Sequence, residues 1–268
     1  MNNNSIGVFD SGLGGLTAVK SISQMLPKEN IVYFGDTGRL PYGTKTEETI
    51  KQYAASDIRF LLSHNVKLIV IACGTASSVA LADMRKMFDT PIVGVVEAAC
   101  TAAVKATVNG RVGVLGTSAT IKSCSYMRGI AELDSSIKVF QKACPLFVPL
   151  VENGHFDSKV TELVVEEYLA PIKNEGVDTL ILGCTHYPLL ENAIKRYMGD
   201  GVRIINVCNE LAKSIEAILG EDNLSARDGD GTCEYYVSDD EKGFAELGGV
   251  FLERKINGQV KKIDIEKY

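Results

Sequence analysis

The stretch VKLIVIACGT at residues 66–75 is repeated, in altered form, as VDTLILGCTH at residues 177–186. The register is the same in both copies, because Val66 and Cys73 each lie 111 residues before Val177 and Cys184. Each copy reads as a short apolar strand that ends in a cysteine and leads into a helix. The repeat therefore predicts two thiols that face one pocket from opposite sides. That placement suits removal of a proton from one face of a carbon and return of a proton to the other.

Strands and helices alternate along nearly the whole chain. Most of the apolar runs are unbroken stretches of β-branched residues and leucine, as expected for strands that are covered on both faces. This alternation is typical of a parallel, doubly wound α/β fold. Thr44-x-x-Glu47 has the pattern of a capping box at the start of the second helix. The predicted strands are 5–9, 31–35, 68–72, 92–95, 111–116, 137–141, 179–183 and 203–207, and the predicted helices are 15–25, 46–62, 77–88, 97–107, 118–130, 158–174, 189–198 and 209–219.

Repetition beyond the cysteines predicts two similar halves. GVFDS at 7–11 matches GVLGT at 113–117, and IVYF at 31–34 matches IKVF at 137–140, both with an offset of 106 residues. We expect two pseudo-symmetric, doubly wound parallel-sheet domains, residues 1–95 plus 207–268 and residues 96–206, with the active site in the cleft between them. In the tail we expect a helix, a strand at 234–237, a helix at 239–247 and a polar hairpin around Asn257 and Gly258, all packed against the first domain.

The composition is that of an ordinary globular protein. The 268 residues include 28 Lys and Arg against 34 Asp and Glu, and the net charge of −6 gives no support for binding nucleic acid or an anionic membrane. We find neither a signal-peptide pattern nor an apolar run near the ~18 residues of a membrane span, so we expect a cytoplasmic protein.

The seven cysteines are widely spaced and include no C-x-x-C pair, which argues against disulfides and structural zinc. We expect Cys100, Cys124, Cys208 and Cys233 to be small buried apolar residues. Cys144, which precedes a proline in an irregular stretch, is assigned no role.

The loops after the predicted strands are rich in small and polar residues that offer N–H and hydroxyl groups. Where such loops begin helices, they bind carboxylates well. A thiol at a helix N-terminus has a lowered pKa, so we expect Cys73 and Cys184 to be partly thiolate near neutral pH. A nucleophilic Cys184 with His186 as its base is an alternative, but it leaves Cys73 without a role.

Five motifs occur in order between residues 8 and 190: VFDSGLGG (8–15), GDTGRLPYG (35–43), ACGTA (72–76), GTSAT (116–120) and GCTHYP (183–188). Together they closely resemble glutamate racemase, and the last favours glutamate over aspartate racemases, in which an acidic residue usually follows the Cys-Thr pair. The resemblance implies an enzyme without cofactor or metal that interconverts L- and D-glutamate and supplies D-glutamate for peptidoglycan. It also implies that a homodimer is common among relatives.

The resemblance implies roles for individual residues. Cys73 would take the α-proton from D-glutamate while Cys184 returns a proton to the opposite face, and the roles exchange for L-glutamate. His186 would assist Cys184, Asp10 would lie near Cys73, and Glu152 matches a further acidic position. The substrate contacts that it implies are Asp10, Ser11, Pro41, Tyr42, Gly43, Gly74, Thr75, Thr117, Thr120, Thr185 and His186.

Gly74 departs from the family, in which most members carry an asparagine that contacts the substrate. With only a backbone N–H here, substrate affinity or the acidity of Cys73 can differ. Asp10, Tyr42 and His186 also have plain structural explanations as capping, turn or packing residues. Three alternative functions stay open: racemisation of another acid such as aspartate, ligand binding without catalysis, and thiol-dependent hydrolysis.

Overall fold

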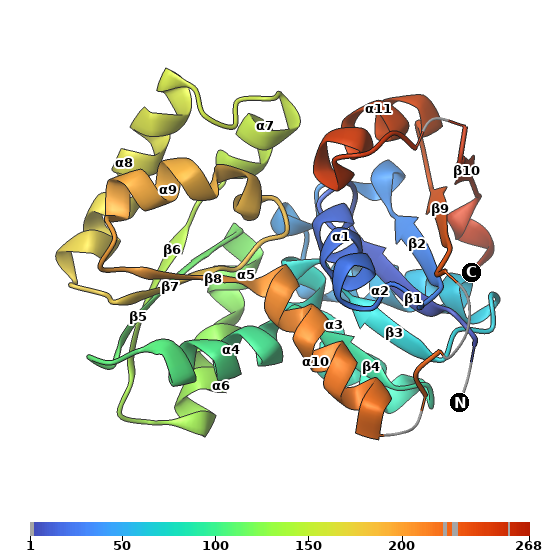
Figure 1. Ribbon diagram of the computed structural model, residues 1–268, viewed down its shortest axis with the longest axis horizontal. Helices are drawn as coiled ribbons and strands as arrows, with labels where there is room; N and C mark the ends of the chain where they lie inside the picture. The colour runs from blue at the N-terminus through green and yellow to red at the C-terminus, as the bar shows by residue number, and fades with distance from the viewer. Residues whose placement is uncertain (1–2, 222–223, 227–229, 257) are drawn as a thin grey trace.

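The strands form two parallel sheets in the computed structural model, which describes residues 3–221, 224–226, 230–256 and 258–268 (Figure 1). The first sheet has the order β10-β9-β2-β1-β3-β4, and the second has the order β6-β5-β7-β8. All pairings in both are parallel, so the predicted α/β class with two parallel-sheet domains is confirmed. The strands are β1 (Ile6–Asp10), β2 (Ile31–Gly35), β3 (Leu68–Ile71), β4 (Ile92–Gly94), β5 (Arg111–Gly116), β6 (Lys138–Ala143), β7 (Thr179–Leu182), β8 (Arg203–Asn206), β9 (Cys233–Val237) and β10 (Val260–Lys262).

Helices connect the strands and cover the sheets. The α-helices are α1 (Leu16–Met25), α2 (Glu47–Leu62), α3 (Gly74–Met87), α4 (Val95–Ala106), α5 (Ser118–Ser123), α6 (Ser125–Leu133), α7 (Phe147–Glu152), α8 (Lys159–Asn174), α9 (Glu191–Met198), α10 (Val207–Glu221) and α11 (Glu241–Leu252). Single 3₁₀ turns are η1 (Thr37–Arg39), η2 (Tyr42–Thr44), η3 (Tyr187–Leu190) and η4 (Ile265–Lys267). Along the described ranges, every helix is too short or too polar to span a bilayer.

The internal repeat is visible in the strand order. Strands β2-β1-β3-β4 of the first sheet and β6-β5-β7-β8 of the second follow the same spatial sequence. The two cysteines of the repeated unit follow the equivalent strands β3 and β7. The strands of the tail extend the first sheet, because β9 pairs with β2. The hairpin prediction was wrong: β10 pairs with β9 in parallel after α11, and Asn257 itself lies outside the described residues.

The core has apolar residues on both faces of the first sheet. Ile6 and Val8 of β1 face one cluster with Leu16 and Val19 of α1, whereas Phe9 faces a second cluster under α2 and α3. This alternation puts α1 and α2 on opposite faces of a strand that is buried throughout. The first cluster continues into the second sheet through α4 and α10, which contact each other (Figure 1). The two halves therefore share one apolar core.

Several predicted element boundaries were wrong, for local reasons. Thr46, and not Thr44, caps α2, because its hydroxyl accepts the N–H of Thr49. Helix α3 begins directly after Cys73, three residues before the predicted start. The helix predicted at 118–130 is divided at Cys124, whose φ of 54° is left-handed.

Candidate active site

Loops at the carboxyl ends of both sheets enclose a cavity of about 420 Å³. The first sheet contributes the loops after β1, β2 and β3, and the second contributes those after β5, β6 and β7. Cys73 and Cys184 both line this cavity, one from each sheet. Its lining residues are Ser11, Leu40, Pro41, Tyr42, Gly43, Thr44, Cys73, Gly74, Thr75, Thr117, Ser118, Cys144, Pro145, Val148, Pro149, Glu152, Cys184, Thr185 and His186.

The thiol of Cys73 lies at the N-terminus of α3. Its sulfur accepts the N–H of Ala76 at 3.5 Å and donates to Oγ of Ser11 at 3.6 Å. Burial, helped by the negative charge of Asp10, raises the pKa of the Cys73 thiol from 9.0 to about 11. The expectation of a lowered pKa at Cys73 was wrong, because burial of the thiol outweighs the effect of the helix N-terminus.

The thiol of Cys184 lies beside an imidazole, whereas that of Cys73 lies at the N-terminus of an α-helix. Its sulfur lies 3.9 Å from Nδ1 of His186, and Nε2 of His186 lies 3.1 Å from Oε1 of Glu152. The segment that follows is the 3₁₀ turn η3, so no α-helix begins at this cysteine. Burial raises the pKa of the Cys184 thiol well above its ordinary value. Cys184, His186 and Glu152 thus form a thiol–imidazole–carboxylate chain along the cavity wall.

Asp10 lies behind the cavity wall and is not among its lining residues. Its Oδ1 accepts the N–H of Gly12 at 2.9 Å, and its Oδ2 accepts the hydroxyl of Thr185 at 3.3 Å. Burial raises the pKa of the Asp10 carboxyl. Because Thr185 follows Cys184, Asp10 links the end of β1 to the loop that carries the second thiol.

A chain of threonine hydroxyls joins the two halves on another side of the cavity. Thr75 and Thr117 lie 2.9 Å apart through their Oγ1 atoms, and Thr117 and Thr120 lie 3.0 Å apart. Thr75 and Thr117 line the cavity, whereas Thr120 is fully buried behind them. Thr120, a predicted substrate contact, is hydrogen-bonded to Thr117 in this arrangement.

Glycines bring the two halves into close contact around the cavity. A Cβ on Gly74 would lie 2.3 Å from the carbonyl oxygen of Gly183, and a Cβ on Gly43 would lie 3.0 Å from Cβ of Thr117. A Cβ on Gly14 would lie 2.1 Å from Oγ1 of Thr185. At Gly74, the space of the usual asparagine side chain is thus occupied by the backbone of the loop that carries Cys184.

The apolar part of the cavity wall that follows β6 was not predicted from the sequence. Cys144, Pro145, Val148 and Pro149 all line the cavity, and the Cys144 thiol donates to the carbonyl oxygen of Lys142 at 3.6 Å. Strand β6 is the equivalent of β2, whose loop carries Pro41 and Tyr42, so the internal repeat contained the signal. Three more lining residues were not predicted, although each is adjacent in the chain to a predicted one: Leu40, Thr44 and Ser118.

The other cysteines are only partly as expected. Cys100 and Cys208 are buried, but Cys124 and Cys233 are partly exposed. Along the described part of the chain, no group of three His, Cys, Asp or Glu side chains is placed to hold a metal ion.

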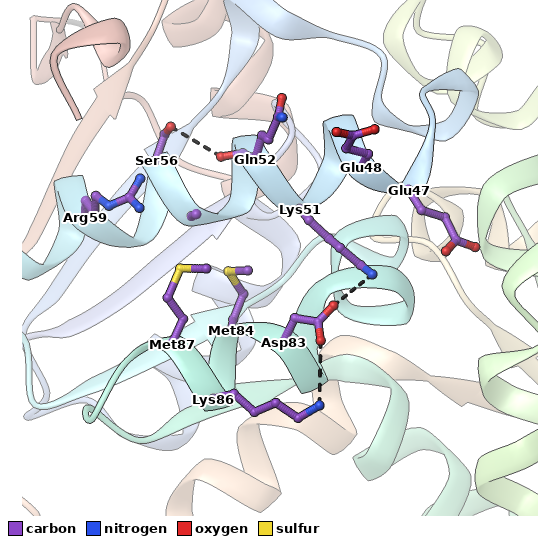
Figure 2. Close-up of a pocket in the computed structure, with 11 residues that line it drawn as sticks. Glu47, Glu48, Lys51, Gln52, Ser56, Arg59, Asp83, Met84, Lys86 and Met87 are labelled. Atoms are coloured by element: carbon purple, nitrogen blue, oxygen red, sulfur yellow. Dashed lines mark hydrogen bonds and ion pairs between the residues drawn. The ribbon is translucent and has the colours of Figure 1, made fainter.

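A larger hollow, of about 1000 Å³, lies between α2 and α3 (Figure 2). One ion pair, of Lys51 with Asp83 at 2.8 Å, reaches across from α2 to α3. Its lining includes no cysteine or histidine. Among these two hollows, the smaller one between the sheets is therefore the candidate active site.

Known proteins resemble the chain over its whole length. Residues 6–215 match the family Asp/Glu/Hydantoin racemase. The chain is 43% identical to the glutamate racemase of Geobacter metallireducens over 263 residues, which are 98% of this chain and 97% of that protein. Its structure is similar to that of glutamate racemase from Bacillus anthracis (TM-score 0.95, 36% identity, 98% of each chain). It is also similar to the Francisella tularensis enzyme in complex with D-glutamate (TM-score 0.94, 35% identity, 100% of each chain).

Proposed function

Because the chain belongs to the Asp/Glu/Hydantoin racemase family, and within it to the glutamate racemases, we propose that it interconverts L- and D-glutamate by a two-thiol mechanism. The observation that carries the proposal is that Cys73 and Cys184 line one cavity from different sheets. The volume of about 420 Å³ is within the range of small-molecule sites. The complex of a relative with D-glutamate supports the choice of substrate.

The reaction exchanges protons between two sulfurs and one carbon. A thiolate takes the α-proton, an S–H bond forms, and the C–H electron pair stays on the carbon. The opposite thiol then delivers its proton to the other face, so that the two cysteines end with exchanged protonation states. For D-glutamate the base is Cys73 and the acid is Cys184, and the reverse holds for L-glutamate.

The raised pKa values of the two cysteines favour two neutral thiols. Since burial raises the pKa of Cys73 to about 11 and that of Cys184 well above its ordinary value, a proton has to leave one of them before catalysis. His186 is the nearest acceptor for Cys184, and Glu152 lies where it stabilises the resulting imidazolium. At Cys73, the substrate ammonium supplies the positive charge that favours the thiolate.

The developing carbanion lies next to a carboxylate and needs strong electrostatic support. The hydroxyls of Ser11, Thr75 and Thr117 are fixed donors at the cavity wall. Such donors act strongly where water is excluded, because they need no reorganisation during the reaction. We propose that the product serves peptidoglycan synthesis in the cytoplasm.

The proposal is tested by racemisation in ²H₂O. The product formed early from either isomer should carry deuterium at Cα while the remaining substrate carries little, because each thiol exchanges its proton with solvent between turnovers. Cys73→Ser and Cys184→Ser should each lower kcat by at least about 10²-fold. Cys124→Ser, at a partly exposed thiol outside the cavity, is the matched control.

Two results would contradict the two-thiol mechanism. One is near-normal turnover by either serine variant at Cys73 or Cys184. The other is transfer of the substrate α-hydrogen itself into the product, which indicates a single base. A covalent acyl-enzyme on Cys184 in mass spectrometry would instead favour thiol-dependent hydrolysis.

A further inference from the structure

A buried charged cluster lies behind the cavity wall formed by residues 40–44. It consists of Asp36, Arg39, Tyr42 and Asp57, and we call it the Arg39 cluster. Asp36 and Asp57 have side chains without solvent exposure, and that of Arg39 is 11% exposed. Arg39 donates through Nε to Asp36 at 2.6 Å and through Nη2 to Asp57 at 2.7 Å.

The Tyr42 hydroxyl joins the two carboxyl groups. Its oxygen lies 2.5 Å from Oδ2 of Asp36 and 3.0 Å from Oδ2 of Asp57. This hydroxyl is therefore engaged inside the protein, although Tyr42 lines the cavity.

Counting protons indicates that one of the two carboxyl groups carries a proton. A tyrosine hydroxyl has one hydrogen and can donate to only one of two carboxylates, so two ionised carboxylates would leave one short oxygen–oxygen contact without a proton. A proton on Asp57 resolves this: Asp57 then donates to the Tyr42 oxygen, and Tyr42 donates to the ionised Asp36. Burial and the charge of Asp36 also raise the pKa of Asp57 well above its usual range. Within the four residues, one negative and one positive charge then remain, Asp36 and Arg39, in direct contact, and the exposed Glu266 lies 3.9 Å from Nη1 of Arg39.

The loop depends on these side chains for its position. Residues 37–39 and 42–44 are single 3₁₀ turns, whose backbone hydrogen bonds have poor geometry. Ser238, which follows β9, donates to Asp36 at 2.9 Å and accepts the N–H of Gly38 at 2.8 Å. The same loop meets the second half of the molecule, where Gly43 approaches Thr117.

We propose that Asp36, Arg39 and Asp57 are positioning residues for racemisation, which hold Pro41, Tyr42 and Gly43 in the substrate-cavity wall, with Asp57 neutral. The proposal rests on the assignment of this cavity as the glutamate site. None of the three side chains lines the cavity, so they act through the loop. Loss of the cluster should weaken substrate binding more than proton transfer.

The test compares variants that keep or break the proposed proton pattern. In Asp57→Asn, the amide oxygen still accepts from Arg39 and the amide N–H still donates to Tyr42, so KM for D-glutamate should stay within about twofold of the parent. Asp57→Ala removes one of two buried hydrogen-bond partners from both Arg39 and Tyr42. Asp36→Asn removes the buried counter-charge of Arg39, whose other ionised neighbour, Glu266, is exposed and lies 3.9 Å away. Both should raise KM by at least about tenfold, with a smaller change in kcat.

Three further measurements separate positioning from general damage. Alkylation of Cys73 by iodoacetamide should be at least as fast in the positioning variants as in the parent, because Cys73 lies on another loop and a displaced wall only widens access to it. Asp83→Asn is the matched control, since Asp83 forms an exposed ion pair with the same helix α2 (Figure 2). Tyr42→Phe keeps the ring and removes the bridging proton, and it should raise KM even if Asp57→Ala does not fold.

The results distinguish the positioning role, the neutral state of Asp57 and the proposed function from one another. An unchanged KM in Asp57→Ala, or in Tyr42→Phe where Asp57→Ala does not fold, overturns the positioning role. Equal damage from Asp57→Asn and Asp36→Asn overturns the neutral state of Asp57. A parent protein that does not racemise glutamate in the same assay overturns the proposed function, and this inference with it.

Discussion

Replacing Gly74 by alanine tests whether the two thiol-bearing loops have to touch. A Cβ here would lie 2.3 Å from the carbonyl oxygen of Gly183, whereas ordinary contact begins near 3.4 Å, so the backbones must separate by 3.4 − 2.3 = 1.1 Å. Because Gly74 follows Cys73 and Gly183 precedes Cys184, this separation moves the sulfurs relative to the substrate. A displacement of about 1 Å at a reacting group lowers rates by about 10²-fold. We therefore expect Gly74→Ala to lose about 100-fold in kcat/KM.

Circular dichroism of the glutamate isomers measures the rate, and thermal unfolding measures stability separately. Gly220→Ala is the matched control, because Gly220 is exposed at the end of α10 and a Cβ there meets no atom within 4 Å. This control should keep its activity and gain a little stability from better helix propensity. Activity of Gly74→Ala within about threefold of the parent would refute the reasoning, since the loops could then separate without loss of catalysis.

Three other predictions concern the titrating groups and the cavity wall. Below pH 9.0 the neutral, buried Cys73 thiol contributes its full stability. Because its pKa in the folded protein is about 11, the free energy of unfolding should fall as pH rises from 9 to 11, by about 1.4 kcal/mol per pH unit. Urea unfolding of the parent and of Cys73→Ser at pH 8 and 10.5 measures this loss of stability, and equal pH slopes in the two proteins would contradict it. Glu152→Gln removes the carboxylate partner of His186 and should lower kcat by about 10- to 100-fold; a normal kcat would remove Glu152 from the proton chain. Cys144→Ala should keep kcat/KM within about threefold, because this thiol donates to a backbone carbonyl and its pKa is raised by burial; a large loss in the same assay would indicate a third working thiol.

Local sequence signals were enough to predict the architecture of two parallel sheets covered by helices. Unbroken apolar runs of strand length, such as that before Cys73, alternate with helical patterns, and this is a consequence of strands that are buried on both faces. The repeat around Cys73 and Cys184 also predicted that both thiols reach one cavity. Both signals depend on residues close together in the chain.

The remaining features depend on tertiary packing. The raised pKa of Cys73 comes from burial, which the local helix N-terminus does not reveal. Asp57 lies in the middle of α2, and from the sequence a single aspartate there is expected at the surface. It is buried because the loop that carries Arg39 packs against it. The apolar wall at Val148 and Pro149 carries no chemical motif, and only the equivalence of β6 with β2 links it to the cavity.

The pairing of β9 with β2 has a consequence for biosynthesis. The second sheet is complete once residue 206 has left the ribosome, whereas the first sheet waits for β9 and β10, which come later in the chain. Until then β2 presents an open edge, which is a template for pairing with neighbouring nascent chains. A messenger truncated after α10 would therefore produce an aggregating polypeptide, even though it encodes both cysteines.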